Sequence, residues 1–259
     1  MKRLSLLALL MTAAALGTLP VRSMETKPSS SDRTVVAKFT PTPITVDGKL
    51  DEAAWAEAPA HSLVLPMMAY DRLPEAMQKT LGNTLREGTK VKLLWDDKYL
   101  YIGGEFTDSD VMNDGVEDQT HFYAKGDLLE VFLKPAGANY YWELYGTPHN
   151  KKSWFVLISR GRPLRDDYLP KTFQSAATID GSFDNWKDRD HGWTVEMAIP
   201  IAELTVHGAD FGPSSAWTIL LARYNYSAYL PKEELSAYPL LSSPNFHLYE
   251  DYAELRLVK

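Results

Sequence analysis

Regular alternation of apolar and polar side chains predicts a β-hairpin near the middle of the chain. Apolar side chains alternate with lysines over 89–95, which is the period-two pattern of a strand with one buried face. Short polar residues at 96–98 favour a turn, and the alternation resumes over 99–106. Gly103 and Gly104 in the second strand indicate either a bulge or a close approach of another part of the chain.

Apolar segments of strand length recur from this hairpin to the C-terminus. We expect further strands at 126–133, 140–145, 154–159, 175–179, 193–199, 217–226 and 255–257, with a short one at 44–46. Helical character is limited to short turns at 51–55 and 201–204, and the polar stretches 161–168 and 231–244 are interpreted as surface segments. Strands at short intervals with few helical periods predict an all-β fold, an antiparallel β-sandwich of the jelly-roll or immunoglobulin-like kind with short helical turns.

The N-terminal segment has the pattern of a secretory signal peptide. Two basic residues precede an apolar run over 4–19, and small residues follow, so we expect cleavage after Ser23 or, alternatively, after Gly17. A membrane anchor is the weaker alternative, because the run is short for a span. The sequence therefore predicts a signal peptide over 1–23, a disordered polar leader over 24–38, one domain over 39–259, and a secreted or periplasmic location.

Charge and composition exclude several classes of partner and of enzyme. Removing residues 1–23 takes away three basic residues and no acidic one, so the formal net charge changes from −7 to −10. Such an acidic chain argues against nucleic acid or an anionic membrane surface as partner. The chain has no cysteine, which excludes a disulfide framework and a thiolate nucleophile. It also contains no nucleophile elbow, phosphate loop or His-Glu-x-x-His motif.

Acidic residues offer two further kinds of chemistry. Asp127 and Glu130 lie in an apolar strand, and because burying an unpaired charge is costly, at least one should face solvent or a ligand. Asp127 with Glu130, or Glu143 with Glu196, could also act as the carboxylate pair of a glycosidase. We predict no cofactor, with calcium as an alternative, because an acidic loop supplies oxygen ligands without matching an EF-hand; the calcium candidates are Asp108, Asp110 and Asp114.

Two motifs carry a family resemblance. The hairpin contains V-x-x-L-W-D-x-x-Y-L-Y, starting at Val91, and the following strand contains D-x-x-E-x-F, starting at Asp127. In this order they resemble family-9 carbohydrate-binding modules and the DOMON-related β-sandwiches that share their fold. Three further segments agree in order, at 44–55, 193–200 and 252–257, so the resemblance covers roughly residues 40–259.

The resemblance implies a binding site in which two aromatic rings enclose a terminal sugar. Phe246 occupies the position of one ring, counted back from the closing strand. The position of the other ring holds Ala124, which departs from the family pattern, and we take Tyr123 as its substitute. Phe246 could instead be a buried core residue. Trp186, in a polar loop, is a further candidate for an exposed ring.

Polar residues of the same site also follow from the resemblance. Glu130 matches the family's hydroxyl-binding acid, and Arg223 and Asn225 fall on the strand that carries an amide side chain in the family. His247 could donate to a sugar hydroxyl or only stabilise its loop. Glu130 and Arg223 could alternatively form a structural salt bridge.

We therefore expect an exported, non-catalytic protein that binds a saccharide and is associated with polysaccharide breakdown, with an unknown partner enzyme. Three alternatives stay open. Related sandwiches bind haem through Met and His, and Met67 or Met68 could serve with a distant His. The protein could be a glycosidase that depends on Glu130, or a purely structural module without a ligand.

Overall fold

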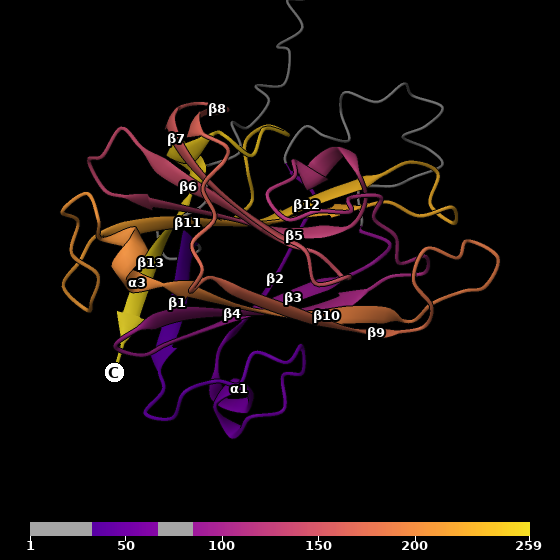
Figure 1. Cartoon of the computed structure of the whole chain (residues 1–259), viewed down its shortest axis with the longest axis horizontal. Coiled ribbons are helices and arrows are strands. Elements are labelled where there is room, and N and C mark those ends of the chain that lie inside the picture. The colour runs from indigo at the N-terminus through magenta and orange to yellow at the C-terminus, as the bar shows by residue number, and fades with distance from the viewer. Residues whose placement is uncertain (1–32, 67–84) are drawn as a thin grey trace, which may run out of the picture.

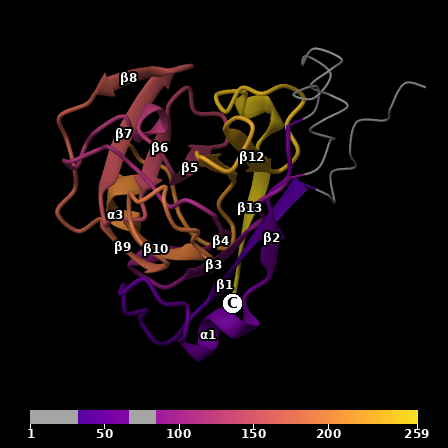
Figure 2. The same ribbon diagram turned by 90° about the vertical axis from the view of Figure 1, so that its right-hand side faces the viewer.

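The computed structural model describes residues 33–66 and 85–259, and their strands form two packed layers (Figure 1). One continuous sheet of 13 strands makes both layers, in the order β8-β7-β6-β5-β11-β13-β1-β3-β4-β10-β9, with β12 beside β11 and β2 beside β3. The sheet folds over at β13 and β1, which connect the layers along one side (Figure 2). This arrangement confirms the predicted all-β sandwich.

The upper layer of Figure 1 contains β5 (Leu128–Pro135), β6 (Tyr141–Gly146), β7 (Lys152–Ser159), β8 (Arg162–Arg165), β11 (Trp217–Asn225) and β12 (Glu234–Tyr238). The lower layer contains β2 (Ala60–Ser62), β3 (Thr89–Trp95), β4 (Tyr99–Thr107), β9 (Gln174–Asp180) and β10 (Gly192–Pro200). The connecting strands are β1 (Thr34–Phe39) and β13 (Ala253–Val258). Helical segments are short, namely α1 (Ala53–Glu57), η2 (Phe122–Ala124), α3 (Ile201–Leu204) and η3 (Tyr249–Asp251).

Four boundaries predicted from the sequence are wrong. Residues 34–38 belong to β1 rather than to a disordered leader, because Val35 and Ala37 are fully buried and β1 pairs in parallel with β13 and β3. Residues 44–46 form no strand, and the Thr45 N–H instead donates to Glu52 Oε1 at 2.8 Å. The stretches 161–168 and 231–244 contain the strands β8 and β12, whose polar side chains hid the pattern of edge strands.

The central hairpin β3–β4 keeps an unbroken register through Gly103 and Gly104. The bulge alternative is therefore wrong, and the close-approach alternative is confirmed. A Cβ atom at Gly103 would lie 2.5 Å from Leu50 Cδ2 and 3.0 Å from the ring of Trp55. Trp55, on α1, is fully buried against this outer face of the lower layer.

The two faces of the upper layer bury different clusters. Inward side chains such as Ile219 and Leu221 join the main core between the layers. Outward side chains such as Leu220, Phe132 and Tyr145 form a second, aromatic cluster. Residues 241–252 and η2 contribute to this outer cluster, so the outer face of β5, β6 and β11 is partly covered rather than fully open.

No helix within residues 33–66 and 85–259 is long and apolar enough to cross a membrane. The predicted signal peptide at 1–23 lies outside these residues.

Candidate functional site

A cavity of about 340 Å³ lies on the outer face of the upper layer. Four of the six residues predicted to bind a sugar line it, namely Tyr123, Glu130, Phe246 and His247. Nine further lining residues were not predicted to bind a sugar, and only Glu143 among them was considered for another role; they are His121, Glu143, Phe155, Leu157, Gly161, Pro163, Tyr224, Pro244 and Asn245. The structure thus brings residues from seven parts of the chain around one cavity.

Strand pairing builds the floor of the cavity. Glu130 on β5 lies opposite Ala222 on β11 and opposite Tyr145 on β6. Because side chains alternate between faces along a strand, Glu130, Glu143 and Tyr224 all point outward from the same face. Two carboxyl groups and one phenol group therefore line the floor, whereas the family resemblance had implied one acid there, Glu130.

One wall of the cavity is the short helical segment η2. Phe122 is fully buried, whereas its neighbours His121 and Tyr123 are exposed. The ring of His121 stacks on Phe155, with centroids 4.3 Å apart and planes 5° apart. Tyr123 is 43% exposed, far more than Phe155 and Phe246 in the same lining, so it has surface free to contact a ligand.

The opposite wall is the segment that precedes η3. Its backbone is fixed, because the Tyr252 hydroxyl donates to Phe246 O at 2.6 Å. The Tyr141 hydroxyl lies 2.9 Å from His247 Nδ1. Phe246 is 6% exposed and contacts Tyr224 edge-on, with centroids 5.5 Å apart. Phe246 is thus both a cavity-lining ring and a core residue, two roles that the sequence analysis had treated as alternatives.

Two neighbouring carboxyl groups, those of Glu130 and Glu143, give the floor its electrostatic character. Burial raises the pKa of Glu130 well above its usual value, and the neighbouring carboxylate of Glu143 adds to this rise. The Tyr145 hydroxyl donates to Glu143, while Glu130 Oε2 is buried without a hydrogen-bond partner. Glu130 is therefore the acid that faces the cavity, as the sequence analysis required of Asp127 or Glu130.

The pKa of Glu130 predicts a specific pH dependence of folding stability. A carboxyl group whose pKa is higher in the folded protein keeps its proton longer when folded, so stability falls as pH rises above the unfolded value of 4.5. Glu130→Gln removes this loss. We expect the variant to exceed the wild type in free energy of unfolding near pH 7, with an advantage that shrinks toward about pH 4.5.

Urea unfolding at a series of pH values measures this difference. Glu105→Gln is the matched control, because Glu105 is an exposed glutamate on β4. A difference between Glu130→Gln and wild type that does not change with pH would contradict the assigned environment of Glu130.

Arg223 and Asn225, predicted to bind the sugar with the other four residues, do not line the cavity. Arg223 lies opposite Leu129, so it points into the core, where its Nη2 is 2.8 Å from Asp108 Oδ2. The amide of Asn225 donates to Glu87 Oε2 at 2.8 Å. The alternative salt bridge between Glu130 and Arg223 is wrong for the same reason, since the two side chains leave opposite faces of the sheet.

The acidic loop uses its carboxylates for other bonds. Asp108 accepts hydrogen bonds from Arg223 and from the indole of Trp193, and Asp110 Oδ2 accepts the Ala228 N–H at 2.7 Å. Asp114 is exposed. In the described part of the chain, no three His, Asp or Glu side chains are grouped to hold a metal ion. The calcium prediction thus has no geometric support there. Met67 and Met68, the haem candidates, lie outside the described residues.

Only one member of each carboxylate pair considered for hydrolysis lines the cavity, namely Glu130 and Glu143. Asp127 points away from Glu130 and accepts the backbone N–H groups of Met112 and Tyr226 at 2.8 and 2.7 Å. Glu196, on the lower layer, accepts the Trp55 indole N–H at 2.9 Å. This hydrogen bond holds α1 against the lower layer, whereas Glu143 lines the cavity on the outer face of the upper layer.

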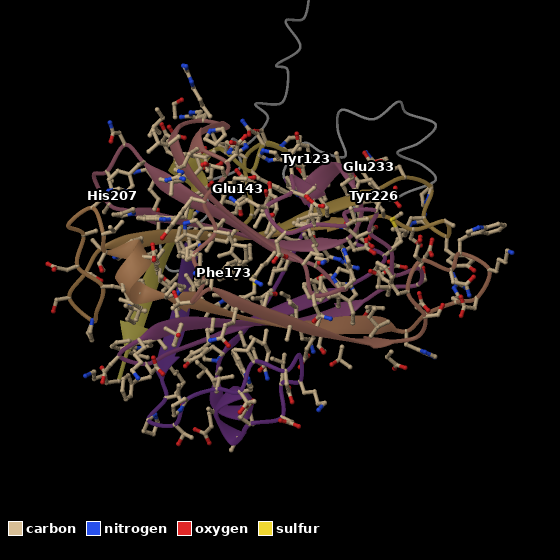
Figure 3. The ribbon with its side chains drawn as sticks, in the orientation of Figure 1. Tyr123, Glu143, Phe173, His207, Tyr226 and Glu233 are labelled. Atoms are coloured by element: carbon tan, nitrogen blue, oxygen red, sulfur yellow. The ribbon has the colours of Figure 1, made fainter. Side chains whose placement is uncertain are left out.

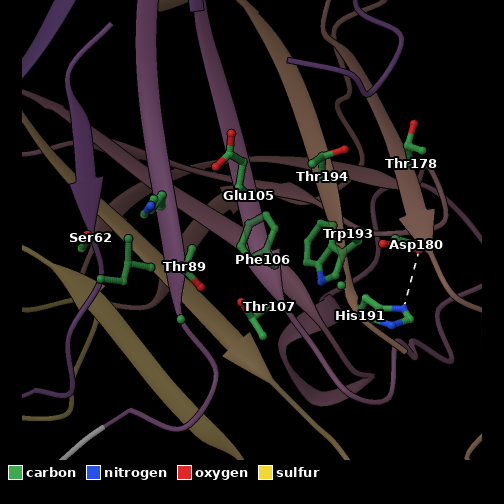
Figure 4. A pocket seen from close by; sticks show the side chains of 14 residues that line it. Ser62, Thr89, Glu105, Phe106, Thr107, Thr178, Asp180, His191, Trp193 and Thr194 are labelled. Atoms are coloured by element: carbon green, nitrogen blue, oxygen red, sulfur yellow. Dashed lines mark ion pairs between the residues drawn. The ribbon is translucent and has the colours of Figure 1, made fainter. Parts of the chain in front are cut away.

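A second groove, of about 560 Å³, lies at the ends of β3, β4, β9 and β10 (Figure 4). Threonine side chains and the facing pair His191 and Asp180 line it, with His191 Nδ1 3.7 Å from Asp180 Oδ1. Its aromatic residues, Phe106 and Trp193, stack on each other at 3.9 Å and are almost wholly buried. The groove therefore offers no free ring face, in contrast to the cavity beside Tyr123.

A family model described as "Carbohydrate family 9 binding domain-like" matches residues 46–216. The chain belongs to this family. The match includes β3 to β10 and therefore the cavity floor formed by Glu130 and Glu143. No curated protein matches the chain.

Solved structures share the fold of this family-9 domain. A protein from Bacteroides uniformis ATCC 8492 superimposes with a TM-score of 0.63 at 10% identity, covering 87% of this chain and 99% of its own. A family-9 module from Caldicellulosiruptor kristjanssonii, solved in complex with cellotriose, gives a TM-score of 0.56 at 13% identity, covering 87% and 94%. The same kind of module was also solved with glucose, with a TM-score of 0.55 at 13% identity, covering 87% and 95%.

Proposed function

We propose that this family-9 domain binds a saccharide non-covalently in the cavity between Tyr123 and Phe246. The observation that carries the proposal is one exposed ring beside buried hydrogen-bonding groups. Tyr123 supplies an apolar face for the C–H groups of a sugar, and Glu130, Glu143 and His247 supply partners for its hydroxyls. The volume of about 340 Å³ lies at the lower end of the range for ligand pockets, which suits a single sugar ring.

The proposed binding is non-catalytic. A glycosidase needs one carboxylate free to act as nucleophile or base beside a carboxylic acid. The Tyr145 hydroxyl instead donates to Glu143, and the Glu143 carboxylate raises the already elevated pKa of Glu130. The pair is better suited to share a proton and accept or donate hydrogen bonds to sugar hydroxyls.

Glucose and cellotriose are the first ligands to test, because related family-9 modules were solved with them. The proposal includes export, supported by the basic and apolar start of the chain, and a role in polysaccharide breakdown, supported by family membership alone.

Tyr123→Ala tests the proposed function. Losing one stacking ring is expected to weaken saccharide binding by about 1–3 kcal/mol, or about 5- to 150-fold in Kd. Calorimetric titration with the best ligand from a glycan array measures this change. Thermal unfolding should be nearly unchanged, since the side chain is 43% exposed.

Tyr168→Ala is the matched control, because Tyr168 is 36% exposed and does not line the cavity. Equal affinity of wild type and Tyr123→Ala, or failure of the wild type to bind any glycan, would contradict the proposed function.

A further inference from the structure

The floor of the cavity carries two acids without a basic partner. Glu130 and Glu143 are both almost wholly buried. Among the residues that the structure describes, no lysine or arginine lines the cavity. Arg160 precedes the lining residue Gly161, but it pairs with Glu250. The negative charge of the floor therefore has no counter-charge in the described lining.

The register of the upper layer places the two acids side by side. Glu143 on β6 lies opposite Phe132, which is two residues along β5 from Glu130. Long side chains on such diagonal positions of one sheet face are within reach of each other. Glu143 and Tyr123 both lie at the upper layer in Figure 3, so the acids form the floor beneath the wall that carries the exposed ring.

The other polar groups around this floor are hydroxyls and imidazoles. They come from η2, β6, β11 and the segment before η3, and they are His121, Tyr123, Tyr145, Tyr224 and His247. Strand β7 contributes the apolar side chains Phe155 and Leu157 to the lining. Burial lowers the pKa of His247, which favours its uncharged form.

One oxygen of the floor lacks a donor. The Tyr145 hydroxyl donates to Glu143, whereas Glu130 Oε2 is buried without a hydrogen-bond partner. A buried carboxyl oxygen without a partner is costly. A ligand that brings a strong donor to this oxygen therefore gains more than one that brings only an apolar face.

An ammonium group fits both acids better than a hydroxyl does. It carries a positive charge and three N–H donors, whereas a hydroxyl is neutral and has one donor. Hydrogen bonds between ionised partners are also stronger than those between neutral groups. A ligand carboxylate, in contrast, would place a third acid beside Glu130 and Glu143, and like charges at one site repel each other.

We propose that the cavity selects an amino sugar, a hexose with a free protonated amine that contacts Glu130 and Glu143, and that it rejects uronic acids. This inference rests on the proposed function and names its ligand class. In the empty cavity, burial and the Glu143 carboxylate raise the pKa of Glu130, so a proton stabilises the pair. The ligand's ammonium group supplies positive charge in place of that proton.

A matched set of monosaccharides tests this selectivity. The probes are glucosamine, galactosamine and mannosamine, their parent hexoses, their N-acetyl forms, and glucuronic and galacturonic acid. They are titrated by calorimetry against the wild type at about pH 6.5, where an amine is charged. In the series that binds, the amino sugar should exceed its parent hexose by at least about tenfold in affinity, or about 1.4 kcal/mol. N-acetylation removes the charge and should remove this gain, and the uronic acids should bind more weakly than the hexoses.

Two isosteric variants assign the gain to the floor. Glu130→Gln and Glu143→Gln keep the side-chain shape and remove one acid each. Each should lower the ratio of amino-sugar to hexose affinity by at least about fivefold. Glu105→Gln is the matched control and should keep the ratio, because Glu105 is exposed on β4 and does not line the cavity. A ratio of two ligands on one protein also cancels any general loss of folded protein.

The outcomes separate this inference from the proposed function. An amino sugar that binds no more tightly than its parent hexose, or a gain that survives in both Glu130→Gln and Glu143→Gln, would overturn the selectivity and leave saccharide binding in the cavity intact. No binding of any probe by the wild type, in this set and on a glycan array, would overturn both.

Discussion

Arg223→Ala is expected to lower the free energy of unfolding by about 3–5 kcal/mol, the usual cost of removing one partner from a buried ion pair. Arg223 and Asp108 are both fully buried. The guanidinium also donates to Thr107 O at 3.0 Å and to the Thr89 hydroxyl at 3.1 Å. Its removal leaves the Asp108 carboxylate buried without its counter-charge. It also removes the donor shared by Thr89 at the start of β3 and Thr107 at the end of β4. Equilibrium unfolding in urea measures the loss.

Arg256→Ala is the matched control for this substitution. Arg256 pairs with Glu254 at 3.0 Å on the surface of β13, where both side chains are more than half exposed. Exposed pairs of this kind contribute about 0–1 kcal/mol. An Arg223→Ala protein as stable as Arg256→Ala, but unable to bind saccharide, would contradict the structural role and return Arg223 to the binding site.

Phe246→Ala is expected to lose both stability and saccharide binding. The ring is 6% exposed and belongs to the outer aromatic cluster, so truncation should cost about 3–5 kcal/mol of unfolding free energy, as for other buried Phe residues. It also removes one wall of the cavity, so affinity should fall by at least about fivefold. Urea unfolding and calorimetric titration of the same preparation measure both effects.

Tyr123→Ala provides the comparison, because it should weaken binding with almost no change in stability. Phe246→Leu restores much of the buried volume and should recover most of the stability, but not the aromatic face. A Phe246→Ala protein with unchanged unfolding free energy would show that this ring is not packed against Tyr224.

Period-two patterns predicted the fold well wherever a strand has one apolar and one polar face. The hairpin 89–106 is the best case, since its lysines mark the outer face. The pattern failed at β1, where Thr34, Val36 and Lys38 are the more accessible positions of a short strand, so the segment resembled a polar leader. It also failed at β8 and β12, because edge strands have few buried positions.

The same periodicity explains which of the predicted site residues line the cavity. Glu130 and Phe246 came from the family resemblance, and both line the cavity. Arg223 and Asn225 were predicted because they lie on the expected strand, without regard to which face of the sheet they point to. They lie two and four residues after Leu221, so they point inward like Leu221 and Ile219. Tyr224, between them, points to the opposite, outward face and lines the cavity.

Other parts of the site had no local signal. Contact between Glu130 and Glu143 depends on the register of β5 against β6, which neither segment specifies alone. His121 reaches the cavity only because buried Phe122 anchors η2. The loop that carries Asn245 and His247 is placed by contacts more than 80 residues away in sequence, such as that with Tyr141.

A crystal structure with bound saccharide tests the central claim most directly. Crystals would be soaked with the tightest-binding saccharide found by titration. We predict one sugar ring between Tyr123 and Phe246, within hydrogen-bonding distance of Glu130 or Glu143. Density for the sugar only at the exposed Trp186, or only in the groove between Thr178 and Thr194, would show that the binding site lies elsewhere on the sandwich.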